Sequence, residues 1–173
     1  MKYFADAASS SSSRDSCPCP SDSTCTCTSI PGRSDATLNR HGVRIGTAEV
    51  YAALESVEEI TGALIVNLNL PRGGFFMPLF VTLEDGAVLD DPLRGKIAGR
   101  LRSQYTARHV PDRIIQVPAI PVTLTGKKME VPVRKILLGV PPDEAANRNA
   151  MANPQSLDAF SDYARTQHDY RLD

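Results

Sequence analysis

The chain has 173 residues, of which 42% are hydrophobic and 23% charged, and its formal net charge at neutral pH is -1. This length suits one domain with a tail, and the near-neutral charge excludes a global field that would draw the chain to nucleic acid. The sequence shows no apolar run near the roughly 20 residues that a membrane helix needs, and no apolar core of a secretory signal. It therefore predicts a cytoplasmic protein that binds neither nucleic acid nor a membrane.

Residues 1–31 have a low-complexity sequence with a serine run and two Cys-x-Cys pairs. Such a segment buries too little apolar surface to offset the entropy of ordering, so we expect it to be disordered. The cysteines could in principle bind a metal, but structural zinc sites usually separate paired cysteines by two to four residues within a folded frame. We therefore predict no metal site. The cysteines concerned are Cys17, Cys19, Cys25 and Cys27.

Residues 32–140 predict a small α+β domain, with short antiparallel strand pairs packed against about three helices. A β-prone start after Gly42 leads into a helix whose N-cap is predicted at Thr47. The segments ITGALIVNLNL and FMPLFVTLEDG, joined by a Pro-Arg-Gly-Gly turn, predict two paired strands. A further helix is predicted after Asp90 and Asp91, either of which can cap it. Its apolar stripe is Leu93, Ile97 and Leu101.

The second half of this domain is predicted to be extended, then turned, then helical. The segment HVPDRIIQVPAIP is broken by prolines, and TLTGKKMEV predicts a tight Thr-Gly turn. The last helix, PVRKILLG, has Pro132 in its first turn and Gly139 at its end. Residues 141–173 are interpreted as a polar extension with a possible short helix at SLDAFSDYART.

Positive charge gathers in residues 91–139, which hold ten Lys and Arg side chains against three carboxylates, a local excess of +7. Within this stretch Lys127 follows Gly126, a residue that lets the backbone approach a partner closely. An ammonium on an exposed turn is a mobile charge suited to a phosphate or carboxylate oxygen, and it could stabilise charge that develops in acyl or phosphoryl transfer. The alternative is the exposed tip of an ordinary hairpin.

A second group of candidate residues lies in the segment GRSDATLNRHGVRIGTAEVY, and it comprises Arg33, Asp35, Gly42 and Arg44. Arginines suit bidentate contacts with anions, and a glycine leaves room for a ligand beside the backbone. A loop with a local Arg–Asp pair would explain the same residues without a ligand. The two interpretations stay open on these residues alone.

Both groups together resemble a known family. The segment just quoted, then MPLFVTL, then VPAIPVTLTGKKMEVPVRKILLG, in this order and spacing, resembles the C-terminal lid domain of acyl-adenylate-forming enzymes. The details, including NPQSLDAF, are similar to acetoacetyl-CoA synthetases over about residues 32–163. The resemblance implies an acetoacetate–CoA ligase reaction. ATP, accompanied by Mg²⁺, and acetoacetate give an acyl-adenylate and diphosphate, and CoA then takes the acyl group and releases AMP.

The resemblance also implies roles for individual residues. Lys127 matches the catalytic lid lysine that contacts the acid carboxylate and the α-phosphate, and Asp35 matches the hinge about which the lid turns between the two steps. Arg33 and Arg44 match nucleotide-binding arginines near the ribose and the phosphate.

Two further matches concern the CoA step. Gly42 matches a CoA-binding glycine beside the pantetheine tunnel, and Arg102 matches an arginine that faces the CoA nucleotide. Lys128 is interpreted as surface.

The resemblance does not cover the family's large N-terminal domain, which carries the phosphate loop and the acid pocket. Lid residues act only where other groups hold the substrates, so we predict that the chain alone is inactive and is a fragment of a ligase. One alternative is a non-catalytic binding or regulatory module that docks on a full-length synthetase. Another is an unrelated cysteine-rich metal-binding protein.

Overall fold

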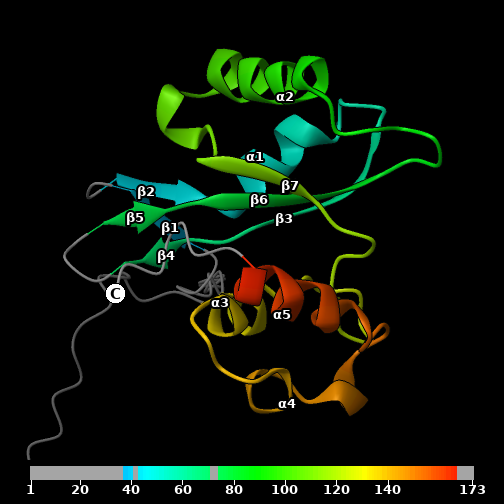
Figure 1. The fold of residues 1–173 in the computed structure, drawn as a ribbon. Helices are drawn as coiled ribbons and strands as arrows, with labels where there is room; N and C mark the ends of the chain where they lie inside the picture. The colour runs from blue at the N-terminus through cyan, green and yellow to red at the C-terminus, as the bar shows by residue number, and fades with distance from the viewer. Residues whose placement is uncertain (1–36, 41–42, 71–73, 167–173) are drawn as a thin grey trace, which may run out of the picture. The chain divides into compact units, whose positions relative to one another are not determined.

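A three-stranded sheet organises the computed structural model, which describes residues 37–40, 43–70 and 74–166 (Figure 1). Its strands are β3 (Ile60–Ile65), β6 (Pro78–Leu83) and β7 (Arg113–Gln116), in the spatial order β3-β6-β7. β3 and β6 pair antiparallel, as the sequence predicts. β7 adds a parallel pair with β6 that the sequence analysis did not foresee. A helical connection between β6 and β7 returns the chain in the same direction, which produces the parallel pairing.

Two short hairpins accompany this sheet. In the first, β1 (Thr37–Arg40) pairs antiparallel with β2 (Val43–Gly46), and in the second, β4 (Leu68–Asn69) pairs antiparallel with β5 (Phe75–Phe76). Leu38 and Ile45 of the first hairpin are buried in the same apolar cluster as the helix that follows it. The Cys-x-Cys pairs, by contrast, lie outside the described residues.

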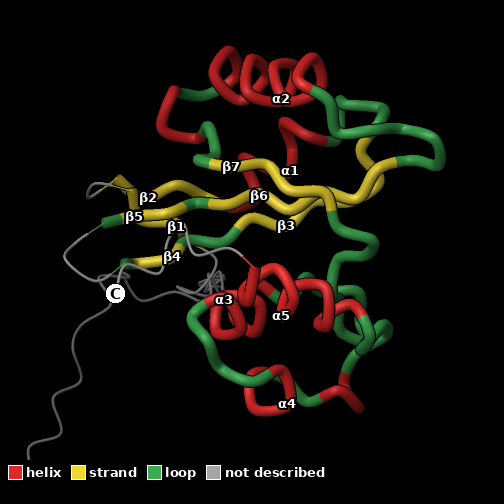
Figure 2. The backbone as a smooth tube through the Cα atoms, viewed as in Figure 1, coloured by secondary structure: helices red, strands yellow, loops and turns green. Residues whose placement is uncertain are grey.

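One face of the sheet is covered by α1 (Thr47–Leu54) and α2 (Asp91–Gln104), as Figure 2 shows. Side chains alternate between the two faces of a strand, so one set from β3 and β6 points toward these helices. That set is Ala63, Ile65, Leu79 and Val81. From α2 the predicted stripe of Leu93, Ile97 and Leu101 is buried against it.

The caps of these two helices differ from each other. Asp90 caps α2 as predicted, because its side chain accepts a hydrogen bond from the Leu93 amide at 2.9 Å. The predicted cap of α1 at Thr47 is wrong. Gly46 is the N-cap and Thr47 is the first helical residue, buried in the domain. β2 runs directly into α1, so the cap position falls one residue earlier than the sequence suggests.

The other face is covered by α3 (Glu130–Leu137) and α5 (Ser156–Thr166), which lie across the sheet from α1 and α2 in Figure 1, and α4 (Pro142–Ala145) packs against these two helices on their side away from the sheet. The alternate side chains of β3 and β6 point this way, together with Val66 just after β3. They are Leu64, Val66 and Phe80. α3 begins two residues earlier than predicted, and Gly139 follows its end with φ +99°. Two 3₁₀ helices, η3 (Ala107–His109) and η4 (Arg148–Ala150), complete the described elements.

The possible helix at SLDAFSDYART is confirmed as α5, and it forms part of the second core. Its residues Leu157, Phe160 and Ala164 are buried, and the Phe160 ring lies edge-on to Phe80 with 4.8 Å between ring centroids. The spacing of these apolar residues suits one face of a helix. Residues beyond 140 therefore supply core side chains, although their composition is polar. None of the described helices is long and apolar enough to cross a membrane.

Removal of the Phe160 ring should show how far the domain depends on α5. We expect Phe160→Ala to lower the free energy of unfolding by about 3–5 kcal/mol, because it opens a cavity against Phe80. Asp162→Ala, on the exposed side of the same helix, should change it by no more than about 0.5 kcal/mol. Urea unfolding of the full chain, followed by circular dichroism, measures both. Equal midpoints for the two variants would contradict the packing of α5 described above.

Candidate functional site

The candidate catalytic lysine, Lys127, lies on a tight turn just before α3. Its carbonyl accepts a hydrogen bond from the Thr123 amide at 2.9 Å, and its own amide donates to Thr123 Oγ1 at 3.0 Å. The Gly126 amide donates to the Thr123 carbonyl at 2.8 Å. Gly126 has φ +77°, a left-handed conformation that strongly favours glycine. The main chain of Lys127 is thus held on both sides by one residue.

The Lys127 side chain has a different environment from its main chain. It is exposed, and among the described residues it has no hydrogen-bond or ion-pair partner. The sequence analysis expected an exposed turn, and the structure has one. An ammonium in this position can approach an anion from outside the domain without first breaking a contact.

Residues 120–123, which lead into this turn and form its first arm, are held by a segment after α4. Asn153 accepts from the Val122 amide through Oδ1 at 3.0 Å and donates from Nδ2 to the Ile120 carbonyl at 2.7 Å. The Ala152 amide donates to the Val122 carbonyl at 3.1 Å. The sequence analysis missed this support. Only the Asn-Pro dipeptide at 153–154, a turn signal, could have pointed to it.

Residues 128–130, which follow the turn and form its second arm, are held by Tyr51 of α1. Lys128 Nζ lies 3.5 Å from the centre of the Tyr51 ring. The Tyr51 hydroxyl donates to Glu130 Oε1 at 2.6 Å and accepts from the Ile65 amide at 3.3 Å. The interpretation of Lys128 as simple surface therefore misses a contact, because the aromatic residue that meets it lies 77 positions earlier in the chain.

The pKa values of this cluster respond to its partial burial. Burial, followed by the hydrogen bond to Glu130, raises the pKa of the Tyr51 hydroxyl far above its ordinary value, so it stays a proton donor. Loss of water around the ammonium lowers the pKa of Lys128, while the nearby carboxylates of Glu130 and Glu55 act in the opposite direction.

The first hairpin is fastened to the sheet by Arg40. Its Nη1 donates to the Val110 carbonyl at 2.7 Å, and its Nη2 contacts Asp112 Oδ1 at 2.6 Å. The other carboxylate oxygen of Asp112 accepts from the Met77 amide at 2.8 Å. Arg40 and Asp112 form a charge-assisted pair, and each makes a further hydrogen bond to the main chain. Such an arrangement fixes the orientation of both side chains. The hairpin is therefore tied to the chain entering both β6 and β7.

The predicted nucleotide and CoA residues are distributed over several elements. Arg44 is exposed on β2, and Arg102 is exposed in the last turn of α2. The remaining predicted positions, Arg33, Asp35 and Gly42, lie outside the described residues. α2 covers one face of the sheet, and the Lys127 turn leads into α3 on the other face. The structure thus separates Arg102 and Lys127 and does not bring them into one site.

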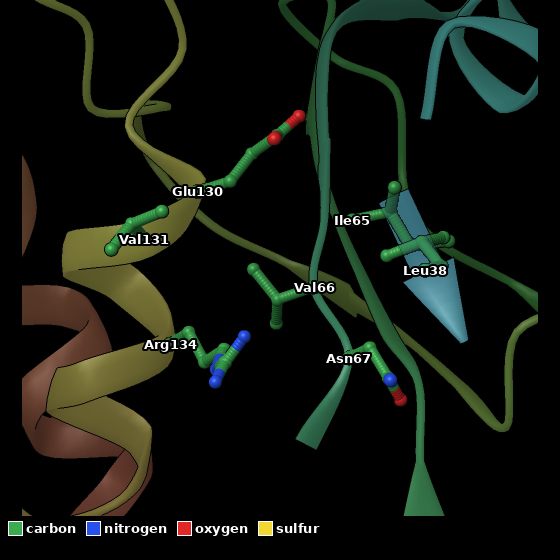
Figure 3. A pocket seen from close by; sticks show the side chains of 7 residues that line it. All are labelled: Leu38, Ile65, Val66, Asn67, Glu130, Val131 and Arg134. Carbon is green, nitrogen blue, oxygen red and sulfur yellow. The ribbon is translucent and has the colours of Figure 1, made fainter. Parts of the chain in front are cut away.

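A small cavity lies between α3 and the strands, as Figure 3 shows. Its volume is about 30 Å³, which has room for water but not for a nucleotide. Glu130 at its edge is the carboxylate that Tyr51 holds. The lining residues are Leu38, Ile65, Val66, Asn67, Glu130, Val131 and Arg134. This cavity is too small to serve as the substrate site.

Asn153 should control the order of the first arm of the turn. We expect Asn153→Ala to speed hydrogen exchange of the Val122 amide by about tenfold or more, because a partly buried donor loses its acceptor. Gln155→Ala, an exposed neighbour, should leave this exchange unchanged. Exchange followed residue by residue by NMR on the full chain decides between them. Equal protection of Val122 in both variants would show that Asn153 does not hold the arm.

Comparisons with known proteins find acetoacetyl-CoA synthetases among the sequence relatives of this chain. Acetoacetyl-coenzyme A synthetase from Rhizobium meliloti (strain 1021) is 44% identical over 132 residues, which are 76% of this chain and 20% of that protein. Acetoacetyl-CoA synthetase from Caenorhabditis elegans is 41% identical over 133 residues, 76% of this chain and 19% of that protein. The chain thus matches about a fifth of the length of these relatives, in their C-terminal region. A scan against models of protein families gives no match.

Solved structures agree with this result. Acetoacetyl-CoA synthetase from Streptomyces lividans superposes with a TM-score of 0.72 at 45% identity, covering 78% of this chain and 20% of that chain. An acyl-CoA synthetase from Brucella canis superposes with a TM-score of 0.51 at 28% identity, covering 62% and 19%. By sequence and by fold, the chain is therefore homologous to the C-terminal region of acetoacetyl-CoA synthetases.

Proposed function

We propose that this domain is the moving lid of a cytoplasmic acetoacetate–CoA ligase. The enzyme would join ATP, acetoacetate and CoA into acetoacetyl-CoA, AMP and diphosphate through an acyl-adenylate. The observation that carries the proposal is the exposed ammonium of Lys127 on a turn whose main chain is fixed, in a chain 44% identical to the corresponding region of an acetoacetyl-CoA synthetase.

In the first step Lys127 would stabilise developing charge. A carboxylate oxygen of acetoacetate attacks the α-phosphorus of ATP, a new P–O bond forms, and diphosphate leaves. Negative charge on the α-phosphate and the attacking carboxylate meets the positive ammonium, which is most effective where water is excluded. Mg²⁺ bound with ATP would neutralise part of the diphosphate charge, and we assign no described residue to it.

In the second step the domain would present another surface. The CoA thiol gives up its proton to solvent, its sulfur attacks the acyl carbon, a thioester bond forms, and AMP leaves with the electrons of the broken C–O bond. Arg102 would face the CoA nucleotide, and Gly42 would leave room for pantetheine. Arg33 and Arg44 would contact the nucleotide. Rotation at Asp35 would exchange the two surfaces, and the placement of α2 and α3 on opposite faces of the sheet supports such an exchange.

The domain needs a larger body to complete this chemistry. Lys127 stands on an exposed turn, and a charge stabilises a transition state only when the reactants are held beside it. We therefore propose that the 173-residue chain alone does not turn over, and that its partner is the large domain that holds ATP and the acid.

A fusion enzyme tests this proposal. Residues 32–173 would replace the C-terminal fifth of the Streptomyces lividans enzyme, and ATP-dependent formation of acetoacetyl-CoA should be retained. Lys127→Ala should slow acetoacetate-dependent exchange of diphosphate into ATP by about 100- to 1000-fold. Transfer from preformed acetoacetyl-adenylate to CoA should change by less than about threefold, because the lysine stabilises charge only in the first step. Lys135→Ala, at another exposed lysine, is the matched control.

Three results would count against the proposal. Equal losses in both half-reactions would contradict the role of Lys127. Robust turnover by the isolated chain would contradict the need for a partner domain. A folded fusion that binds ATP but forms no adenylate would favour a non-catalytic docking module.

A further inference from the structure

We infer that Tyr51 is a positioning residue for Lys127: by holding Lys128 and Glu130 on one side of the turn, it directs the Lys127 ammonium away from the domain. The inference rests on the proposed function, which gives Lys127 its task. Tyr51 itself touches no substrate in this scheme. It acts through two residues that follow the lysine in the chain.

The direction of each side chain after the turn supports this role. Lys128 lies over the Tyr51 ring and Glu130 accepts the Tyr51 hydroxyl, while Met129 between them packs against the second apolar cluster. Lys128 pairs with Val122 in an isolated antiparallel bridge, and neighbouring side chains point to opposite sides there, so Lys127 lies on the side opposite Lys128. Lys127 and Lys128 are both exposed, so it is the ring contact of Lys128 that distinguishes them.

The charges of the cluster give Tyr51 a second effect. Two neighbouring ammonium groups repel each other and would compete for the same anion. The ring face attracts the Lys128 ammonium, and Glu130 and Glu55 lie near it. Both lysines are exposed, but Lys128 is engaged by the ring and nearby carboxylates, whereas among the described residues Lys127 has no such contact.

Tyr51 also links three elements that are distant in the sequence. It belongs to α1, which directly follows the strand carrying Arg44, and its hydroxyl contacts both the Ile65 amide in β3 and Glu130 in α3. An aromatic side chain has few rotamers and transmits position well. Through this one side chain the turn keeps a fixed place relative to the predicted nucleotide-binding hairpin.

The full chain allows a test that needs no catalysis. With rates measured across a pH series, so that the rate constant of each neutral amine is obtained, acetic anhydride should acetylate Lys127 about three- to tenfold faster than Lys128, because only Lys128 is shielded by a ring. Tyr51→Leu should bring the two rates together. Lys128→Arg should leave the rate at Lys127 unchanged, because a guanidinium also stacks on an aromatic face. Fragment-ion mass spectrometry locates the acetyl groups, and circular dichroism checks that each variant is folded. Equal rates at the two lysines in the unmodified sequence would overturn the inference.

A double-mutant cycle in the fusion enzyme tests the positioning itself. Tyr51→Leu should lower the turnover number of adenylation about three- to tenfold with little change in KM for ATP, and should leave the CoA step unaltered. Tyr51→Phe, which keeps the ring, should lose less. In the Lys127→Ala background the Tyr51 substitution should cost nothing more, because the residue that it positions is gone.

The outcomes of this cycle distinguish the proposed function of Lys127 from the proposed positioning role of Tyr51. If Lys127→Ala has no effect on adenylation, the proposed function fails. If Lys127→Ala slows adenylation but Tyr51→Leu is additive with it, or slows both half-reactions equally, Tyr51 has only a general structural role and the inference fails.

Discussion

Burial of both faces of β3 and β6 is the constraint on which the rest of this domain depends. Leu64 and Phe80 point one way, Ile65 and Leu79 point the other, and all four are fully buried. Leaving either set in water would forfeit about 1.5–3 kcal/mol for each large side chain. Helices must therefore cover both faces. A small domain built in this way offers two separate outer surfaces, and its candidate residues are divided between them.

Local sequence predicted the elements whose own periodicity is strong. α2 followed from Leu93, Ile97 and Leu101 with the Asp90 cap, and the pairing of β3 with β6 followed from two apolar runs around a Gly-rich turn. The exposure of Lys127 was also predicted, because a tight turn such as the one at Gly126 usually lies on the surface of a domain. These features depend on residues within one or two turns of each other, which a single sequence displays directly.

The features that sequence reasoning did not reach depend on partners far along the chain. The parallel position of β7 depends on where α2 returns the chain. The contact of Lys128 depends on Tyr51, and the order of the turn depends on Asn153. No pattern around Tyr51 indicates its role, and Asn153 is marked only by the Asn-Pro turn signal. The resemblance to a family suggested the role proposed for Lys127, but it did not indicate which side chains hold the turn around the lysine.

The anchoring of Arg40 has a mechanical consequence. Its guanidinium joins β1 to the Asp112 carboxylate, and that carboxylate accepts a hydrogen bond from the Met77 amide. The hairpin bearing Arg44 is thereby fastened to the sheet, so in the rotation proposed above it would move together with the sheet as one rigid body. In such a rotation, surface groups far from the pivot would travel further than groups close to it.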